Sequence, residues 1–192
     1  MQYRKITTFF GFLFGITIAI FGVFFFNFAN FLTYDGRTLV DLFIEIKENT
    51  FVGLYEFSWI GFRFNLFNFF YVMPFIENKG LFILEAFLPV FLTWFSSGLI
   101  IGLFSVGAKR GILFSFIVIS LLVILWLCFA VISGANITFV FIGNIFETGG
   151  GILTALLSVL IGGAIGGAIT GAISIKIENN KIVKDVTANH KK

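Results

Sequence analysis

Four long apolar runs limit what this chain can fold into more than any other feature of its sequence. A helix rises about 1.5 Å per residue and the hydrocarbon core of a bilayer is about 30 Å thick, so about 20 apolar residues cross it. Runs of that length lie at residues 6–32, 81–106, 111–134 and 150–175. Only 12% of the residues are charged, against roughly 25% in soluble domains. The sequence therefore predicts an all-α integral membrane protein with four transmembrane helices, forming a single membrane domain over residues 1–192.

The first run has a second interpretation, because Arg4 and Lys5 precede it as basic residues precede a secretory signal. The apolar part of a signal peptide, however, is only about 7–15 residues long. We therefore interpret residues 6–32 as an uncleaved anchor.

The positions of lysine and arginine predict the orientation of the spans, because cytoplasmic flanks are enriched in these residues. Nine of the thirteen lie before the first span, between the second and third spans, or in the tail at 176–192: Arg4, Lys5, Lys109, Arg110, Lys176, Lys181, Lys184, Lys191 and Lys192. We therefore expect both termini in the cytoplasm, an outer loop at 33–80, and a location in the plasma membrane.

Residues 51–76 form a fifth apolar stretch whose placement the sequence leaves open. It contains Glu56 and Arg63, and a charge at the bilayer centre costs roughly 2.5–3.5 kcal/mol on insertion scales. A full crossing would also move the basic turn at 109–110 to the outer side. We favour an aromatic re-entrant or interfacial segment, in which Glu56 and Arg63 share a helix face and neutralise each other.

The stretch "RTLVDLFIEIKENT" at 37–50 has the pattern of an amphipathic helix. Thr38 and Asp41 have the spacing of a capping box. One face would be apolar and the other acidic, with the apolar stripe formed by Leu39, Leu42, Phe43 and Ile46. We expect this helix to lie parallel to the outer surface, where it either covers the end of the bundle or acts as a lid or docking site.

Small residues recur at helical spacing in three of the four spans. In lipid, helices associate where small residues let their backbones approach closely. The positions predicted for helix packing or for an interface are Gly11, Gly15, Gly98, Gly102, Gly162, Gly163, Gly166, Gly167 and Gly171. The bulky row of the fourth span should face lipid, and it consists of Leu153, Leu157, Ile161, Ile165, Ile169 and Ile173. The third span has few small residues and should be more exposed.

These glycines are compatible with three roles. They can pack the helices of one chain, join the chain to another copy or another subunit, or let a substrate approach backbone carbonyls. Two adjoining rows of small residues on the fourth span exceed what one neighbouring helix requires, and this excess favours an interface.

The sequence contains no motif for catalysis or metal binding. It has one cysteine, Cys128, and one histidine, His190, and it lacks the serine hydrolase, zinc protease and phosphate-loop patterns. We therefore predict a non-enzyme without cofactor, metal or nucleic-acid partner. Trp126 lies deep in the third span and is expected to pack against a neighbouring helix, and Asn136 begins a glycosylation sequon.

Two acidic residues at predicted span ends, Glu85 and Glu147, are candidates to line a path through the membrane. Both can reach water from an interfacial position, which we favour over a role as proton or cation relay.

The sequence thus predicts a non-enzymatic polytopic membrane protein. We expect a structural or accessory subunit of a membrane assembly, packed through glycine-zipper helices against copies of itself or other membrane subunits. The alternative is a small transporter or channel component, with Glu56, Arg63, Glu85 and Glu147 along its path. A polar cavity would favour transport, and a buried apolar contact would favour assembly. The four-span outline is similar to that of claudins and tetraspanins, but the cysteines of their outer loops are absent from residues 33–85, so the sequence assigns the chain to no family.

Overall fold

The structure is a computed structural model of the chain. It describes residues 2–28, 30–34, 36–62, 77, 79–83, 87–135 and 145–189. Arg63, Glu85, His190, the sequon at Asn136 and the second half of the stretch at 51–76 lie outside the described residues. Glu147 is described by its backbone alone.

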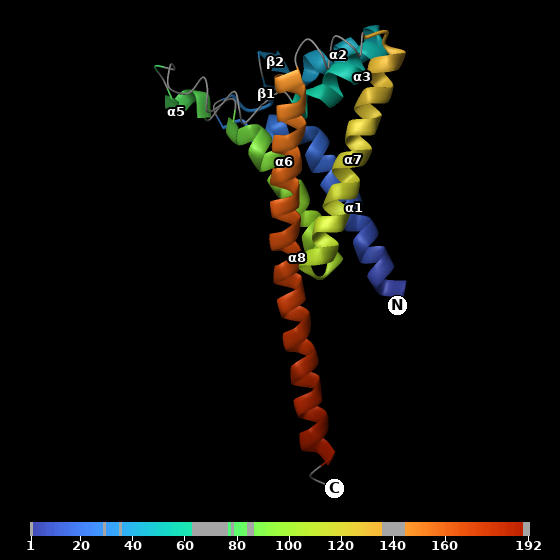
Figure 1. Cartoon of the computed structure of the whole chain (residues 1–192), viewed down its shortest axis with the longest axis vertical. Helices are drawn as coiled ribbons and strands as arrows, with labels where there is room; N and C mark the ends of the chain where they lie inside the picture. Colours follow the sequence, from blue (N-terminus) through green and yellow to red (C-terminus); the bar gives the residue numbers. More distant parts are fainter. Residues whose placement is uncertain are drawn as a thin grey trace.

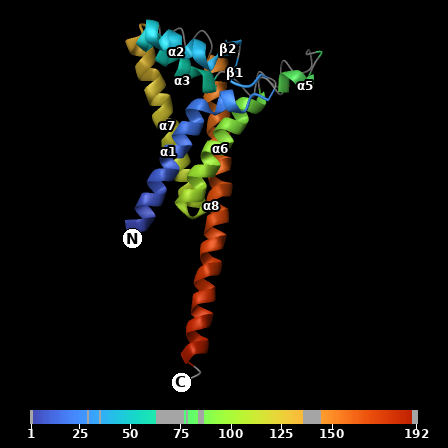
Figure 2. The same cartoon turned by 180° about the vertical axis from the view of Figure 1, so that it is seen from behind.

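In the part of the chain that the structure describes, four helices are long and apolar enough to cross a membrane, as the sequence predicts. They are α1 (Gln2–Phe25), α6 (Leu88–Ser105), α7 (Ala108–Ile132) and α8 (Ile145–Asn189). Helix α6 packs between α1 and α8, and α7 packs against α8. The N-terminal end of α1, the α6–α7 turn and the C-terminal end of α8 point towards the same end of the molecule (Figures 1 and 2).

Several helix ends differ from the predicted limits, because local side-chain chemistry decides them. Helix α1 ends at Phe25 and not at residue 32. Beyond it, the Asn27 side chain donates to the Thr33 carbonyl at 2.6 Å and accepts from the Asn30 amide at 3.2 Å. These bonds fold the following residues into a turn instead of another helical turn. Helix α6 begins at Leu88, later than the predicted residue 81, with proline in its first turn.

Helix α8 is longer than the predicted span at 150–175 at both ends. It continues to Asn189 through most of the tail that we expected to follow the span at 176–192. Residues 172–189 contain neither glycine nor proline, so nothing in that sequence interrupts a helix. At about 1.5 Å per residue its 45 residues measure about 67 Å. Figure 1 shows α8 extending well past the other helices.

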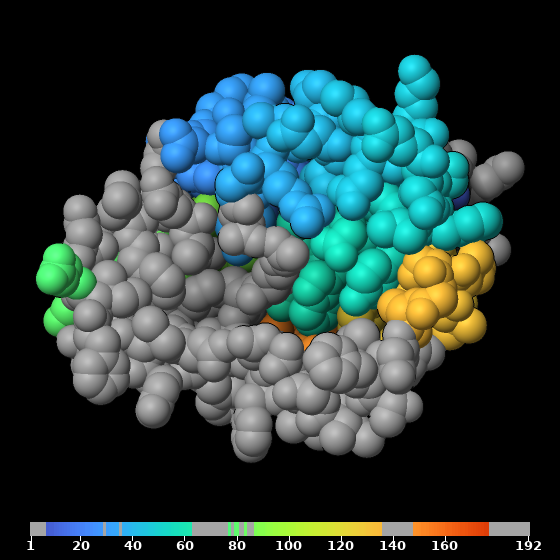
Figure 3. Space-filling model, turned by 90° about the horizontal axis from the view of Figure 1, so that it is seen from above, coloured from blue at the N-terminus to red at the C-terminus, as the bar shows by residue number. Residues whose placement is uncertain are grey.

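Short elements cover the opposite end of the bundle. The antiparallel strands β1 (Thr33–Tyr34) and β2 (Arg37–Thr38) lead into α2 (Leu39–Glu48), α3 (Thr50–Trp59) and the 3-10 turn η1 (Ile60–Phe62). A further short helix, α5 (Lys79–Phe82), precedes α6. We refer to α2, α3 and η1 together as the cap, and Figure 3 shows its surface at this end of the molecule.

Helix α2 confirms the predicted amphipathic helix and its capping box. The Asp41 amide donates to the Thr38 hydroxyl, while the Asp41 carboxylate accepts from the Thr38 amide at 2.9 Å. Leu42 is fully buried, but Phe43 is 50% exposed, so the predicted apolar stripe is only partly covered. Helix α3 has ten residues, about 15 Å, which is too short to cross a bilayer.

The outward faces of α7 and α8 agree with the sequence. The bulky row of α8, from Leu153 to Ile173, is 40–53% exposed. Of the four candidate spans, α7 is the least buried.

Candidate functional site

Glycines bring α6 and α8 into backbone contact. A Cβ atom added at Gly98 would overlap the carbonyl of Val159, and one added at Gly102 would overlap the carbonyl of Gly163. From the other side, Gly162 and Gly166 lie against the α6 backbone at Phe95, Leu99 and Leu103. Both helices therefore need glycine where they meet.

The second glycine row of α8 lies against α7 and the α6–α7 turn. A Cβ atom at Gly163 would lie 2.7 Å from the Gly111 carbonyl oxygen, and one at Gly167 would lie 2.5 Å from that of Gly107. The Gly107 amide also donates to the Gly167 carbonyl at 2.9 Å. A Cβ atom added at Gly171 would only reach ordinary van der Waals contact with Gly107. We refer to the contacts of α8 with α6, α7 and their turn as the glycine seam.

The glycine seam favours one of the three roles that the sequence leaves open for these residues. We predicted that the second glycine row of α8 is available to a partner chain. In the structure this row packs against α7 and the α6–α7 turn of the same chain. On α1, Gly11 and Gly15 lie against Phe104 and Ile101 of α6. Eight of the nine predicted glycines, all but Gly171, therefore lie where a Cβ atom would overlap another part of their own chain, which favours intramolecular packing.

The hydroxyl groups buried inside the bundle are mostly bonded to backbone carbonyls. Thr93, Ser105, Thr154 and Ser158 each donate to the residue four positions earlier in their own helix. Ser97 joins two helices by donating to the Gly15 carbonyl at 2.8 Å. The buried Ser115 hydroxyl has no hydrogen-bond partner, and among the described residues the interior of the bundle contains no chain of charged groups.

All three tryptophans of the sequence converge where the cap packs on the bundle. The rings of Trp59 and Trp126 stack with centroids 4.6 Å apart. Phe62 lies between this pair and Trp94, at 6.3 Å from Trp126 and 5.0 Å from Trp94. The Trp94 indole donates to the Gly61 carbonyl at 2.7 Å. We expected a packing role for Trp126 but did not predict this cluster, because its members lie far apart in the sequence.

A cavity of about 190 Å³ lies beside the tryptophan cluster. Its walls come from α1, α6 and α7, and α3 and η1 contribute the cap side. The lining is almost entirely aliphatic and aromatic. Its two side chains with polar hydrogens already donate: Trp94 to Gly61, and Ser58 to the carbonyls of Leu54 and Tyr55.

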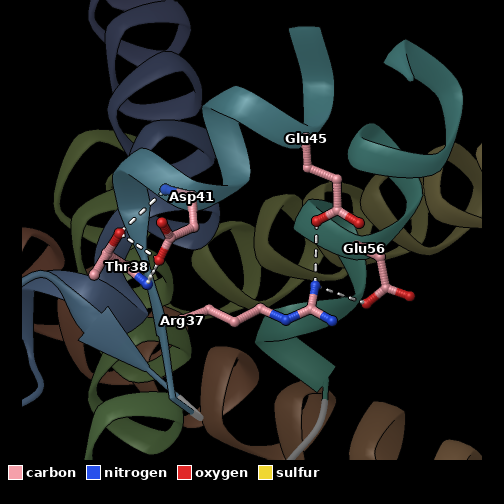
Figure 4. Close-up of polar contacts among 5 residues, drawn as sticks. All are labelled: Arg37, Thr38, Asp41, Glu45 and Glu56. Carbon is pink, nitrogen blue, oxygen red and sulfur yellow. Dashed lines mark hydrogen bonds and ion pairs between the residues drawn. The ribbon is translucent and has the colours of Figure 1, made fainter. Parts of the chain in front are cut away.

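Arg37 joins strand β2 to both helices of the cap (Figure 4). Its guanidinium lies 3.2 Å from the Glu45 carboxylate on α2 and 3.6 Å from that of Glu56 on α3. Burial raises the pKa of Glu56, the Arg37 charge opposes that shift, and Glu45 adds to it. The predicted partner of Glu56, Arg63, lies outside the described residues.

Sequence analysis did not identify Arg37 as a site residue. The available signal was the charge balance of the outer loop at 33–80, where four basic residues accompany six acidic ones. Arg37 lies next to the capping threonine at the start of α2, a position from which a long side chain can reach the acidic face of that helix.

Apart from the short β1–β2 pair, the described residues define a helical protein with four candidate membrane spans, a cap over one end and an apolar cavity beneath it. Comparisons with protein-family models, curated proteins and solved structures found no match for this chain. Its function must therefore be argued from its own residues.

Proposed function

We propose that this chain is a non-enzymatic multi-pass protein of the plasma membrane and serves as a structural or accessory subunit of a membrane assembly. The observation that carries the proposal is the interior of the bundle. Glycine contacts bring its helices together, and its buried hydroxyls mostly bond to backbone carbonyls. Such an interior suits a rigid scaffold.

The transporter alternative has less support, because it requires charged residues along a path. Glu56 is paired with Arg37 in the cap, at the end of the bundle. Arg63 and Glu85 lie outside the described residues. The cavity beneath the cap is apolar, and we expected a transporter to have a polar one.

The proposal includes an orientation in which the N-terminal end of α1, the α6–α7 turn and the far end of α8 face the cytoplasm. Lysine and arginine are concentrated at this end of the molecule, which supports that orientation through the positive-inside rule. The cap then lies on the outer side.

The partner surface that we propose is the exposed apolar face of α2, because the glycine seam is already occupied within the chain. Val40, Phe43 and Ile44 lie on one helical face and are 65%, 50% and 49% exposed. These residues belong to none of the four candidate spans, so lipid around those spans does not account for their exposure. Apolar patches of this kind are typical of interaction sites.

Photo-crosslinking in native membranes tests the proposal. A photoreactive phenylalanine analogue is placed at Ile44, and the matched control carries it at Ile161, which is 50% exposed on the bulky row of α8. We expect protein adducts from position 44 and only lipid adducts from position 161. The native mass of the solubilised particle should exceed that of one chain.

Two results would contradict parts of the proposal. A particle containing a single chain, with no protein adduct from either position, would exclude the assembly function. Protein adducts from Ile161 alone would retain the assembly and exclude the α2 face as its contact.

A further inference from the structure

We propose that the cavity beneath the cap binds one acyl chain of a bilayer phospholipid, which enters from the side between α1 and α7. This inference goes beyond the proposed function but depends on the membrane location that is part of it. It rests on the position of the cavity, its walls and its size.

The position of the cavity exposes it to the bilayer. Helices α1 and α7 cross near Phe12 and Phe114, whose rings are 6.1 Å apart, and they diverge towards the cap (Figures 1 and 2). The cavity lies on the cap side of that crossing, between Ile20 of α1 and Leu125 of α7. Leu125 is 39% exposed, so the wall at this point faces the surroundings of the bundle. At the depth of the candidate spans those surroundings are hydrocarbon.

The walls select an apolar occupant. Water needs two to four polar partners to occupy a cavity, and the two donors in the lining, Trp94 and Ser58, are already bonded to carbonyls. The rest of the lining is aliphatic and aromatic, as at Leu54, Phe57 and Leu122. A hydrocarbon chain gains dispersion contacts here that a water molecule cannot replace.

The size of the cavity is sufficient for part of an acyl chain. An apolar cavity of about 150 Å³ stays dry and holds a molecule such as benzene, and this one measures about 190 Å³. Trp94 forms its inner wall and is 1% exposed, so a chain segment in the cavity would lie against an indole that the bulk bilayer does not reach. That indole serves as a reporter.

Quenching of Trp94 fluorescence by brominated lipid tests the proposal. The full chain, with Trp59→Phe and Trp126→Phe so that Trp94 is the one indole, is reconstituted into phosphatidylcholine nanodiscs with or without bromine on the acyl chains. Bromine quenches indole fluorescence only at short range. We expect strong quenching of Trp94, and none by acrylamide in water.

Filling the cavity should then abolish that quenching. Ala19 lines the cavity and is 4% exposed, so Ala19→Leu occupies the space of the chain segment. Leu125→Phe narrows the mouth without changing a buried residue and provides a second variant if Ala19→Leu does not fold. We expect a several-fold loss of quenching in both variants, and no change in the control Ile161→Phe on the bulky row of α8.

Three results would contradict the proposed lipid site. Weak quenching in the parent protein, or equal quenching in the parent and both filled variants, would overturn the proposal. Quenching by acrylamide in place of brominated lipid would identify a water-filled cavity. Recovery of folded protein in the nanodiscs is checked first, so failure of the membrane location is distinguished from failure of the lipid site.

Discussion

Arg37 connects strand β2 to two helices of the cap through one side chain. It extends from β2 and contacts carboxylates on both α2 and α3. Glu56 is the more buried of the two carboxylates, with 24% of its side chain exposed. The charge of Arg37 therefore matters most for Glu56, whose ionised form has lost part of its hydration.

Substituting Arg37 should shift the titration of Glu56. In Arg37→Gln the opposing charge is gone, so we expect the pKa of Glu56 to rise further above its ordinary value. Carbon NMR of labelled glutamate side chains measures the shift. As the control, Lys47→Gln on α2 removes a charge of the same sign that takes no part in the Arg37 pairs, and it should leave the pKa of Glu56 nearly unchanged.

The sign of the related pH dependence follows from linkage. A carboxyl group whose pKa is raised in the folded state stabilises that state while it is protonated. The contribution of Glu56 is therefore fully present below its unfolded pKa and is lost as pH rises through the raised folded pKa. In Arg37→Gln the loss of stability should occur at higher pH. An unchanged dependence of the free energy of unfolding on pH would show that the Arg37–Glu56 pair does not determine it.

The capping box offers a second test on single residues. Thr38→Val removes the hydroxyl that accepts from the Asp41 amide, which should cost α2 about 1 kcal/mol. Hydrogen exchange at the amides of Asp41 and Leu42 should become about fivefold faster, which is the factor that about 1 kcal/mol makes in the opening equilibrium. Thr50→Val changes an exposed threonine outside the box and provides the control. Equal exchange in both variants would contradict the role of the cap hydroxyl.

At the scale of elements, the packing of α8 depends on where glycine is required. Gly102 lies where a Cβ atom would overlap α8, whereas Gly149 on α8 has nothing within 4 Å. Both belong to helices, so the intrinsic preference of a helix for alanine over glycine applies to both. Only the contacts across the glycine seam distinguish them.

Alanine at these two positions should therefore change stability in opposite directions. We expect Gly102→Ala to destabilise the bundle by about 1–3 kcal/mol through overpacking, and Gly149→Ala to stabilise it by up to about 1 kcal/mol. Steric trapping in bilayers measures both free energies of unfolding. Destabilisation of similar size in both variants would contradict the glycine seam as a close-packed contact.

The elements also show what the sequence could predict. The capping box and the rows of small residues were visible, because each depends on spacing within one helix. The end of α1 could not be predicted from the sequence, because "FFFNFANFL" remains apolar beyond the turn that Asn27 forms. The second neighbour of α8 was missed because the tight turn at Gly107, with φ of 108°, brings the start of α7 against α8.

For the whole molecule, the arrangement of charge allows a direct test of sidedness. Single cysteines are introduced in a Cys128→Ser background at the exposed positions Lys109, Lys176 and Glu48. An impermeant maleimide applied to intact cells should label Glu48→Cys, and it should label Lys109→Cys and Lys176→Cys only after permeabilisation. Labelling of Lys109→Cys together with Glu48→Cys in intact cells would contradict the proposed orientation.

The cavity is a property of the whole molecule and could not be predicted. Its lining residues come from α1, α3, η1, α6 and α7, and no spacing within one segment reveals that they meet. The ion pairs of Arg37 could not be predicted either. They join residues 8 and 19 positions apart in the sequence, and the geometry of the turns between them is not evident from the sequence. Periodicity predicts which residues share a face, and tertiary packing decides what that face meets.

The length of α8 means that a small change in its tilt displaces its far end by several ångströms. Beyond Lys176 the helix continues without interruption to Asn189, a distance of about 20 Å from the end of the apolar segment. Gly167, where the α6–α7 turn contacts α8, lies about 33 Å before Asn189. Because a helix is stiff over that distance, a tilt of about 10° at Gly167 would move the far end of α8 by about 6 Å. A slight repacking around the glycines would thus be amplified into a displacement large enough to make or break contacts far from the bundle.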